Sequence, residues 1–300
     1  MKNRAGYLMV AVSAVGYGCV TTFVKIALGY GLNVVTIGAI RFILASVFLW
    51  VMLLVLRVPV RVNPAKFFSL MAAGALGFAG TSAAYFAAVE KIPISLAALI
   101  VYIYPIIVTV AGSVIDRTKP EPRTFASMIV AFTGLALLLN VSLRGAGSGG
   151  VLMSLVSACI YSSYIIFSSR MLKDIDPLVV TAYVCSSAAF SFAVAGFASR
   201  SLVYPLPQKT WLLMGGFAVF ATVLPVFLFF KGMKKIGPSN AAIVSNLEPV
   251  ATVFLGIALF SETLSPFQFL GAFLVVAGIL LLQFNIRDLK VKDAEDLHSN

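Results

Sequence analysis

The residue best placed to do chemistry is Glu248, in the middle of the apolar stretch 237–260. A carboxyl group is costly inside a membrane-length segment, so a functional role is the default explanation. Glu248 can carry a proton or pair with a cationic group of a substrate. The structural alternative is a protonated carboxyl that hydrogen-bonds backbone carbonyls freed by Pro249. Both interpretations stay open at the level of sequence.

Other polar side chains also lie well inside apolar stretches. Tyr102 and Asn246 each follow a serine by seven residues, so each shares a helix face with that serine. Tyrosine offers an aromatic wall and a hydroxyl, which suit amphipathic organic solutes, although a buried tyrosine is more often an interhelical hydrogen bond. Asn246 and Glu248 are about 200° apart on an ideal helix, so both face one cavity only if Pro249 distorts it. The predicted substrate-binding residues are Tyr17, Thr81, Tyr85, Tyr102, Tyr161, Asn246 and Glu248.

Three prolines interrupt apolar stretches: Pro105, Pro225 and Pro249. Each is expected to remove a helix hydrogen bond, which is tolerated at membrane depth beside a cavity or neighbouring helices. We predict that they are hinges of moving gates, with static kinks as the alternative. For Arg41, snorkelling to the outer interface or capping a neighbouring helix end is preferred over substrate binding.

Catalytic, metal and cofactor sites are not indicated. The single histidine, His298, lies near the end of a charged tail, and Cys19, Cys159 and Cys185 fall in apolar stretches without metal-ligand spacing. The sequence shows neither a phosphate loop nor a nucleophile next to a base. We therefore expect no enzymatic activity, no metal and no cofactor.

The composition is that of a membrane protein, with 60% apolar and 11% charged residues among 300. Apolar runs of membrane length recur from end to end. The expected fold is an all-α membrane protein with ten transmembrane helices, at about 5–28, 34–57, 66–89, 93–116, 122–143, 149–172, 177–199, 208–233, 237–260 and 266–285.

The net charge of +11 is spread over short gaps between apolar runs, which argues against a nucleic-acid partner. Lysine and arginine gather at both ends and in every second loop. The opposite loops hold only Lys91, Arg144, Arg200 and Lys209. By the positive-inside rule, both termini should be cytoplasmic.

The chain also repeats itself. Lys91, Pro105 and Gly112 recur as Lys235, Pro249 and Gly256, an offset of 144 residues (235 − 91). Residues related by this offset are called equivalent below. The expected units are a first five-helix repeat at 1–144, a second at 145–286 and a cytoplasmic tail at 287–300. Since five is odd, the second repeat should be inverted in the membrane, as in alternating-access transporters.

The segments RFILA, KIGPSNAAIVSNLEPV and SETLSPFQFLGAFLVVAGILLL, within about 5–285, resemble the EamA-type transporters of the drug/metabolite transporter superfamily. Among these, the chain is most similar to bacterial aromatic amino acid exporters. The resemblance implies ten helices with both termini inside, a cavity between two inverted halves, and export of amino acids or related metabolites. The first half departs from the family pattern, with Tyr104 and Thr118 where the second half has Glu248 and Glu262.

The leading hypothesis is a monomeric secondary transporter in the bacterial inner membrane that exports amino acids, aromatic ones included, by alternating access. Its partners would be the small-molecule substrate and the lipid bilayer. A drug or nucleotide-sugar carrier of the same superfamily is the alternative. A non-transporting membrane scaffold or a lipid enzyme is the less favoured one.

Overall fold

The computed structural model describes residues 4–119, 121–142, 147–204, 206, 208–261 and 263–283. Within these ranges the regular structure is entirely helical, as predicted. Eight helical segments are long and apolar enough to cross a membrane, and two shorter apolar helices accompany them. Glu262 and the predicted tail at 287–300 lie outside the described residues.

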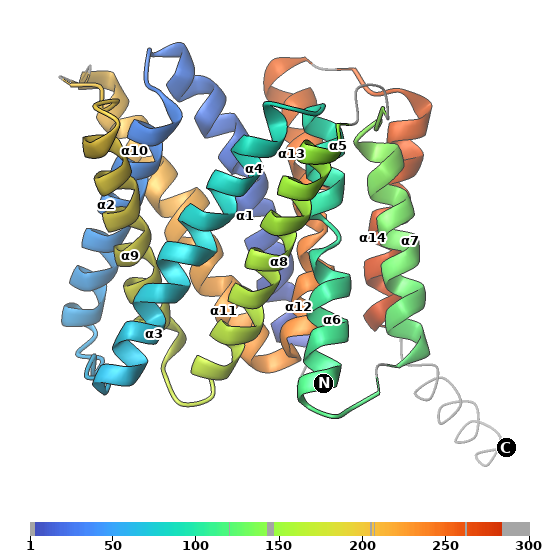
Figure 1. Cartoon of the computed structure of the whole chain (residues 1–300), viewed down its shortest axis with the longest axis horizontal. Helices are drawn as coiled ribbons and strands as arrows, with labels where there is room; N and C mark the ends of the chain where they lie inside the picture. The colour runs from blue at the N-terminus through green and yellow to red at the C-terminus, as the bar shows by residue number, and fades with distance from the viewer. Residues whose placement is uncertain are drawn as a thin grey trace, which may run out of the picture.

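The helices run side by side in one bundle, and α1 begins at the end of the bundle at which α14 ends (Figure 1). Four segments are divided by a break or by a π-helical turn. The elements are α1 Arg4–Gly29, α2 Val34–Val55, α3 Pro64–Gly74, η1 Ala75–Gly80, α4 Thr81–Val89, α5 Ile94–Val101, α6 Tyr104–Ile115, α7 Pro122–Leu138, α8 Ser148–Met171, α9 Pro177–Ala198, α10 Gln208–Ala218, η2 Val219–Val223, α11 Leu224–Ile236, α12 Pro238–Ser245, α13 Leu247–Phe260 and α14 Pro266–Gln283.

Local chemistry explains many of the boundaries. Asn33 and Asn63 cap α2 and α3 by accepting a hydrogen bond from the backbone three residues on, and Asp176 caps α9 in a similar way. The eighth segment, expected to end at about 233, continues as α11 to Ile236. The lysines in its last turn favour this extension, since cations stabilise the C-terminal end of a helix dipole.

The breaks occur at equivalent positions of the two repeats. The π-helical turn η1 starts at Ala75 and η2 at Val219, which differ by 144 (219 − 75). A proline, Pro225, follows η2, whereas Thr81 follows η1. The first repeat therefore makes the same turn without a proline, so the turn belongs to the fold rather than to Pro225 alone.

Contacts between the repeats are reciprocal. The Ser13 hydroxyl of α1 donates to the Pro225 carbonyl of α11 at 2.7 Å, and the equivalent Ser157 of α8 donates to the equivalent Thr81 carbonyl of α4 at 3.0 Å. Helix α2 packs on its equivalent α9, and α7 on its equivalent α14. Each repeat thus completes its packing on the other.

Close packing of α7 on α14 follows the same reciprocity. A Cβ added at Gly134 would lie 2.7 Å from the carbonyl oxygen of Gly271. At the equivalent Gly278, an added Cβ would lie 2.9 Å from the carbonyl oxygen of Ser127, which is the equivalent of Gly271. Both positions need glycine because the facing atoms are backbone.

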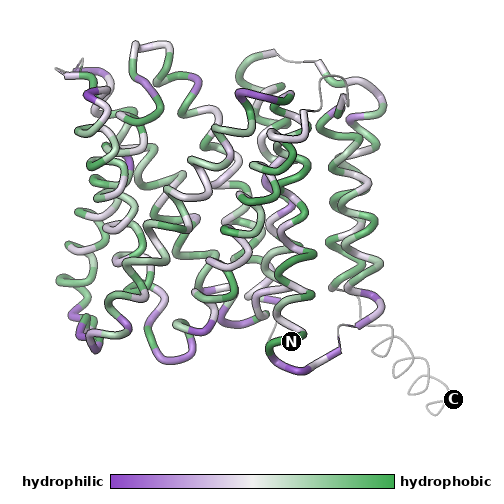
Figure 2. Tube along the Cα trace, in the orientation of Figure 1, coloured by the Kyte–Doolittle hydropathy of each residue, from purple (hydrophilic) through white to green (hydrophobic). Residues whose placement is uncertain are grey.

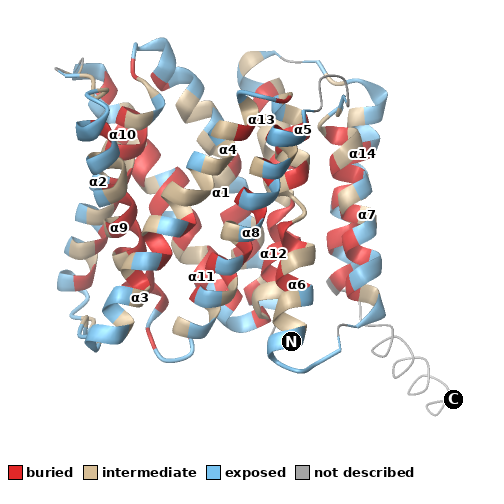
Figure 3. Cartoon of the chain, viewed as in Figure 1, coloured by how far each residue is buried: buried red, intermediate tan, exposed pale blue. Residues whose placement is uncertain are grey.

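The outer surface of the bundle is apolar, as a lipid-facing surface must be. Large side chains such as Leu54, Val114 and Phe190 are about two-thirds exposed or more, at 75%, 72% and 68%. Hydrophilic residues concentrate at the two ends of the bundle (Figure 2). Buried residues lie mainly on the helix faces turned toward one another (Figure 3).

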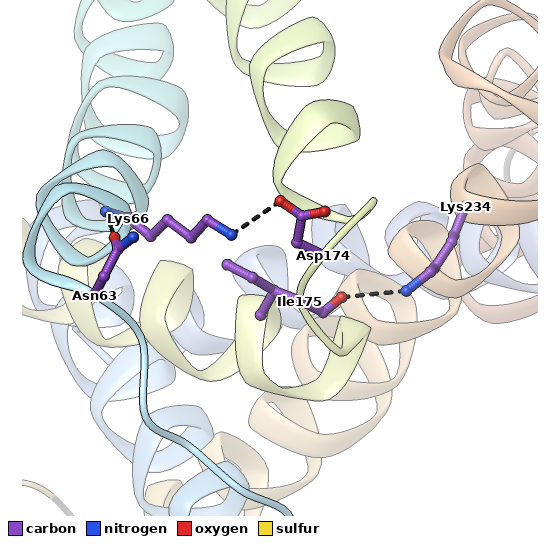
Figure 4. Close-up of polar contacts among 5 residues, drawn as sticks. All are labelled: Asn63, Lys66, Asp174, Ile175 and Lys234. Carbon is purple, nitrogen blue, oxygen red and sulfur yellow. Dashed lines mark hydrogen bonds and ion pairs between the residues drawn. The ribbon is translucent and has the colours of Figure 1, made fainter.

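One end of the bundle carries a polar clasp, formed by the α8–α9 loop with α3 and α11 (Figure 4). Lys66 of α3 forms an ion pair with Asp174 of the loop, with Nζ 2.9 Å from Oδ2. Lys234 of α11 donates to the carbonyl of Ile175 at 3.3 Å. The loop therefore ties together two helices from different repeats.

The clasp should be sensitive to acid. The hydrogen bond from Lys66, and then its charge, lower the pKa of Asp174. The ion pair therefore stabilises the folded protein above the ordinary carboxyl pKa of about 4, and this contribution is lost as the pH falls through the lowered pKa. We expect a small difference in melting temperature between wild type and Asp174→Asn at pH 7, because the pair is exposed, and no difference near pH 2. Lys66→Met should behave like Asp174→Asn in the same scans. A wild-type advantage that persists in acid would contradict the assignment.

The glycine contact gives a second stability prediction. Gly134→Ala should lower the free energy of unfolding by about 1–3 kcal/mol, because the new methyl group meets the backbone of α14. Gly215→Ala in α10 is the matched control, since nothing lies within 4 Å of a Cβ there. It should be neutral or stabilising because alanine favours helix. Thermal unfolding of the detergent-solubilised variants measures both. Equal behaviour of the two would disprove the close α7–α14 contact.

Candidate functional site

Aromatic rings form a continuous path through the bundle. It starts at the break between α5 and α6, crosses α8 and η1, and ends between α2 and α9. The successive centroid distances are 6.4 Å for Tyr102–Tyr104, 4.8 Å for Tyr104–Tyr161, 5.9 Å for Tyr161–Tyr164, 5.7 Å for Tyr164–Phe78, 5.1 Å for Phe78–Phe42 and 5.7 Å for Phe42–Phe192.

The hydroxyl groups divide the tyrosines by role. Tyr104 is buried and donates to the Ala242 carbonyl of α12 at 3.1 Å, so its hydroxyl is a link between the repeats. The half-buried Tyr17, Tyr85, Tyr102 and Tyr161 have no hydrogen-bond partner for their hydroxyls within the described ranges. These four predicted binding residues can therefore still bond to a ligand.

Two of the predicted residues lie at the break between α12 and α13. Asn246 stands between the helices, is 3% exposed, and its Oδ1 lacks a partner among the described residues. Glu248 is half-buried in the first turn of α13, where the helix dipole favours a carboxylate. The equivalent of Asn246 is Tyr102, which occupies the break between α5 and α6.

The breaks change the interpretation of the three prolines. Pro105, Pro225 and Pro249 all lie in the first turn of a helix, α6, α11 and α13. An N–H group in the first turn after a break has no intrahelical partner, so Pro105 and Pro249 do not remove an interior hydrogen bond as expected. Pro225 differs, because η2 runs into α11 without a break and the helix is continuous from Gln208 to Ile236. The distortion that the sequence argument required also lies at Asn246 rather than at Pro249. Glu248 makes no hydrogen bond to a described carbonyl.

Electrostatic range connects Glu248 to the aromatic path. Its charge acts on Tyr102, Tyr104 and Tyr161. Tyr85 also acts electrostatically on Tyr102, and Tyr161 acts electrostatically on Tyr17. The structure thus brings five of the seven predicted residues into one neighbourhood.

Thr81 has a more structural position. Its carbonyl accepts the hydrogen bond from Ser157, and its Oγ1 is buried without a partner in the described part of the chain. Thr81 begins α4 directly after η1, so it marks the π-helical turn of the first repeat.

Arg41 is the residue that sequence reasoning placed wrongly. Instead of snorkelling outward, its Nε donates to Oγ1 of the fully buried Thr222 in η2 at 2.8 Å. Its guanidinium carbon lies 4.7 Å from the ring centres of both Phe42 and Phe217. The available signal was Thr222, the one polar side chain in the apolar run 217–230.

A pocket of about 470 Å³ lies beside this site, between the α3–η1 segment and α8. Leu76, Gly77, Cys159 and Ile160 line it, and Tyr164 of the aromatic path forms part of its wall. Leu76 is 63% exposed, so the pocket opens on the outer face of the bundle.

Among the described residues, no three His, Cys, Asp or Glu side chains come together in a way that could hold a metal ion. Cys19, Cys159 and Cys185 are free thiols. The site is therefore made of aromatic, hydroxyl and single charged groups.

Comparison with known proteins agrees with this architecture. The model of the EamA-like transporter family matches the chain twice, at residues 4–140 and 148–284. The chain therefore belongs to the EamA-like transporter family, and it is a multi-pass membrane transporter. The double match also shows that the two halves are copies of one unit.

Similar proteins cover nearly the whole chain. The uncharacterized transporters YcbK and YyaM of Bacillus subtilis are 24% and 25% identical, over 93% and 96% of both chains. The uncharacterized inner membrane transporter YicL of Salmonella typhimurium is 21% identical over 73% of this chain and 74% of its own. A solved crystal structure at 18% identity has a TM-score of 0.79 and covers 93% of this chain and 97% of its own, which shows the shared fold.

The division of the tyrosines can be tested by removing single hydroxyls. Tyr104→Phe should lower the free energy of unfolding by about 0.5–1.5 kcal/mol, because it removes the bond to Ala242. Tyr161→Phe is the matched control and should leave stability unchanged, since its hydroxyl has no described partner. Chemical or thermal unfolding in detergent measures both variants. A larger loss for Tyr161→Phe than for Tyr104→Phe would overturn the division.

Proposed function

We propose that this chain exports amino acids, aromatic ones included, across the bacterial inner membrane by alternating access. The observation that carries the proposal is the cluster of unpaired hydroxyl and charged groups around paired helix breaks. Polar groups without partners are costly in a membrane interior unless water or a substrate meets them. An aromatic wall with few polar groups suits an amphipathic organic solute.

The proposed architecture has ten transmembrane helices in two inverted five-helix repeats, at 1–144 and 145–286. Two observations support it. The reciprocal bonds of Ser13 and Ser157 are those expected when a two-fold axis relates two units. Five helices per unit then reverse the entry side of the second, and the basic loops favour cytoplasmic termini.

The proposed moving parts are the interrupted segments. Irregular backbone at membrane depth is tolerated where it borders protein or a cavity. Pro105, Pro225 and Pro249 each lie in the first turn of the helix that follows a break or a π-helical turn, which supports a role near the ends of rigid pieces. Rocking of these pieces would open the site to one side and then to the other.

In the proposed binding mode, Tyr17, Tyr85, Tyr102 and Tyr161 contact the substrate side chain, and Thr81 borders them. Asn246 and Glu248 bind the amino acid backbone. Asn246 supports this division, because it lies at the break before Glu248 and its buried Oδ1 has no partner among the described residues.

The test is counterflow of labelled phenylalanine or tryptophan into liposomes that contain the purified protein and unlabelled amino acid. Wild type should accumulate label transiently. Tyr102→Ala and Asn246→Ala should reduce the initial rate about tenfold or more, since each removes a group of the site. Gly215→Ala, away from the site, should keep the wild-type rate.

The same liposomes with and without a pH gradient separate proton-coupled from facilitated export. Absence of counterflow with every amino acid would sink the proposal and favour a drug or nucleotide-sugar substrate instead.

A further inference from the structure

Two opposite charges lie unpaired in the interior of the site. Arg41 and Glu248 are both half-buried, and neither forms an ion pair with a described residue. Arg41 uses only its Nε within the protein, and the Glu248 carboxylate accepts no hydrogen bond from the described part of the chain. An unpaired charge in such a place is costly, so a ligand that pairs with these groups would be stabilised there.

Helix α1 packs against both η2, which holds Arg41 through Thr222, and α13, which carries Glu248. A Cβ at Gly16 would lie 3.1 Å from the Phe220 carbonyl oxygen in η2, the turn that holds Arg41 through Thr222. A Cβ at Gly18 would lie 3.1 Å from the carbonyl oxygen of Glu248. The two contacts are separated by about 3 Å of helix rise.

The residue between these two glycines is Tyr17, which lies within electrostatic range of Arg41 and of Tyr161. The charges of Arg41 and Glu248 also act on each other, although they form no ion pair. The two groups are therefore close enough for their charges to interact, although they do not contact each other as an ion pair.

We propose that Arg41 and Glu248 form a zwitterion site. The Nη donors of Arg41 receive the carboxylate of an α-amino acid, and the carboxylate of Glu248 receives its ammonium group. This deepens the proposed function and rests on it. It adds Arg41 as a residue that determines specificity.

The setting of Arg41 suits this task. A guanidinium matches a carboxylate with two parallel hydrogen bonds. Thr222 occupies the Nε, and the rings of Phe42 and Phe217 hold the guanidinium by cation–π contacts, which leaves its Nη groups for the ligand. The equivalent position in the second repeat is Cys185, so the pseudo-symmetric scaffold carries this cation once.

Equilibrium binding to the purified wild-type protein tests the proposal without any mutation. Labelled phenylalanine is displaced by unlabelled phenylalanine, by phenethylamine, which lacks the carboxylate, and by 3-phenylpropionate, which lacks the ammonium. Each analogue should bind about tenfold more weakly or worse, since it leaves one charged group without its partner. Equal potency of either analogue would overturn the zwitterion site while leaving amino acid transport intact.

Variants assign each end. Arg41→Gln should weaken phenylalanine about tenfold or more but leave phenethylamine within about twofold, and Glu248→Gln should do the same with 3-phenylpropionate as the unaffected ligand. Retained binding of the unaffected analogue also shows that the variant is folded.

Thr222→Val removes the acceptor for Nε but keeps the guanidinium, so it should retain the preference for phenylalanine. If it instead loses that preference as Arg41→Gln does, Arg41 only braces η2 and the proposal fails. Failure of wild type to bind or exchange any amino acid would reject the proposed function, and this inference with it.

Discussion

The constraint on which this structure depends is that a bilayer offers no hydrogen bonds to an exposed backbone. Helices can cross it only if their interruptions face protein or a cavity. Here the interruptions fall at η1, η2 and the two breaks at Tyr102 and Asn246, and all four lie among packed helices. Tyr102 and Asn246 lie at the two breaks, and Thr81 directly follows η1, so part of the proposed site lies where the backbone is irregular.

Much of the fold could be predicted from sequence because it depends on local chemistry. Apolar length places the helices, and the offset between Lys91 and Lys235 reveals the duplication. The π-helical turn η1 could not be predicted, because no proline marks it. It forms where α4 packs on α8, and the bond from Ser157 to Thr81 mirrors that of Ser13 to Pro225. Reciprocal packing, rather than local propensity, explains its presence.

In the candidate site, too, the sequence identifies the unusual residues, whereas their partners depend on the tertiary structure. Tyr17, Tyr161 and Glu248 stand out because polar side chains are rare in apolar runs. Arg41 was misplaced because the direction of a long side chain depends on its partners. Thr222, which accepts its hydrogen bond, is 181 residues away in the chain. Likewise, a single sequence does not distinguish Tyr104, which bonds to Ala242, from Tyr161, which has no described partner.

Scaffold and site differ in symmetry, and this difference bears on how such a transporter can work. The packing contacts are duplicated, as the glycine pairs of α7 and α14 show. The charges are not duplicated, because the equivalent of Glu248 is Tyr104 and the equivalent of Arg41 is Cys185. A duplicated scaffold gives two states of similar energy, since each repeat can adopt the arrangement of the other. In the proposed mechanism, a single pair of charges would hold the substrate in one pose in both states. The ion pair of Lys66 and Asp174 likewise has no counterpart in the other repeat, because the equivalent positions hold Thr210 and Tyr30. Under the proposed alternating access, this ion pair would favour the state in which that end is held together.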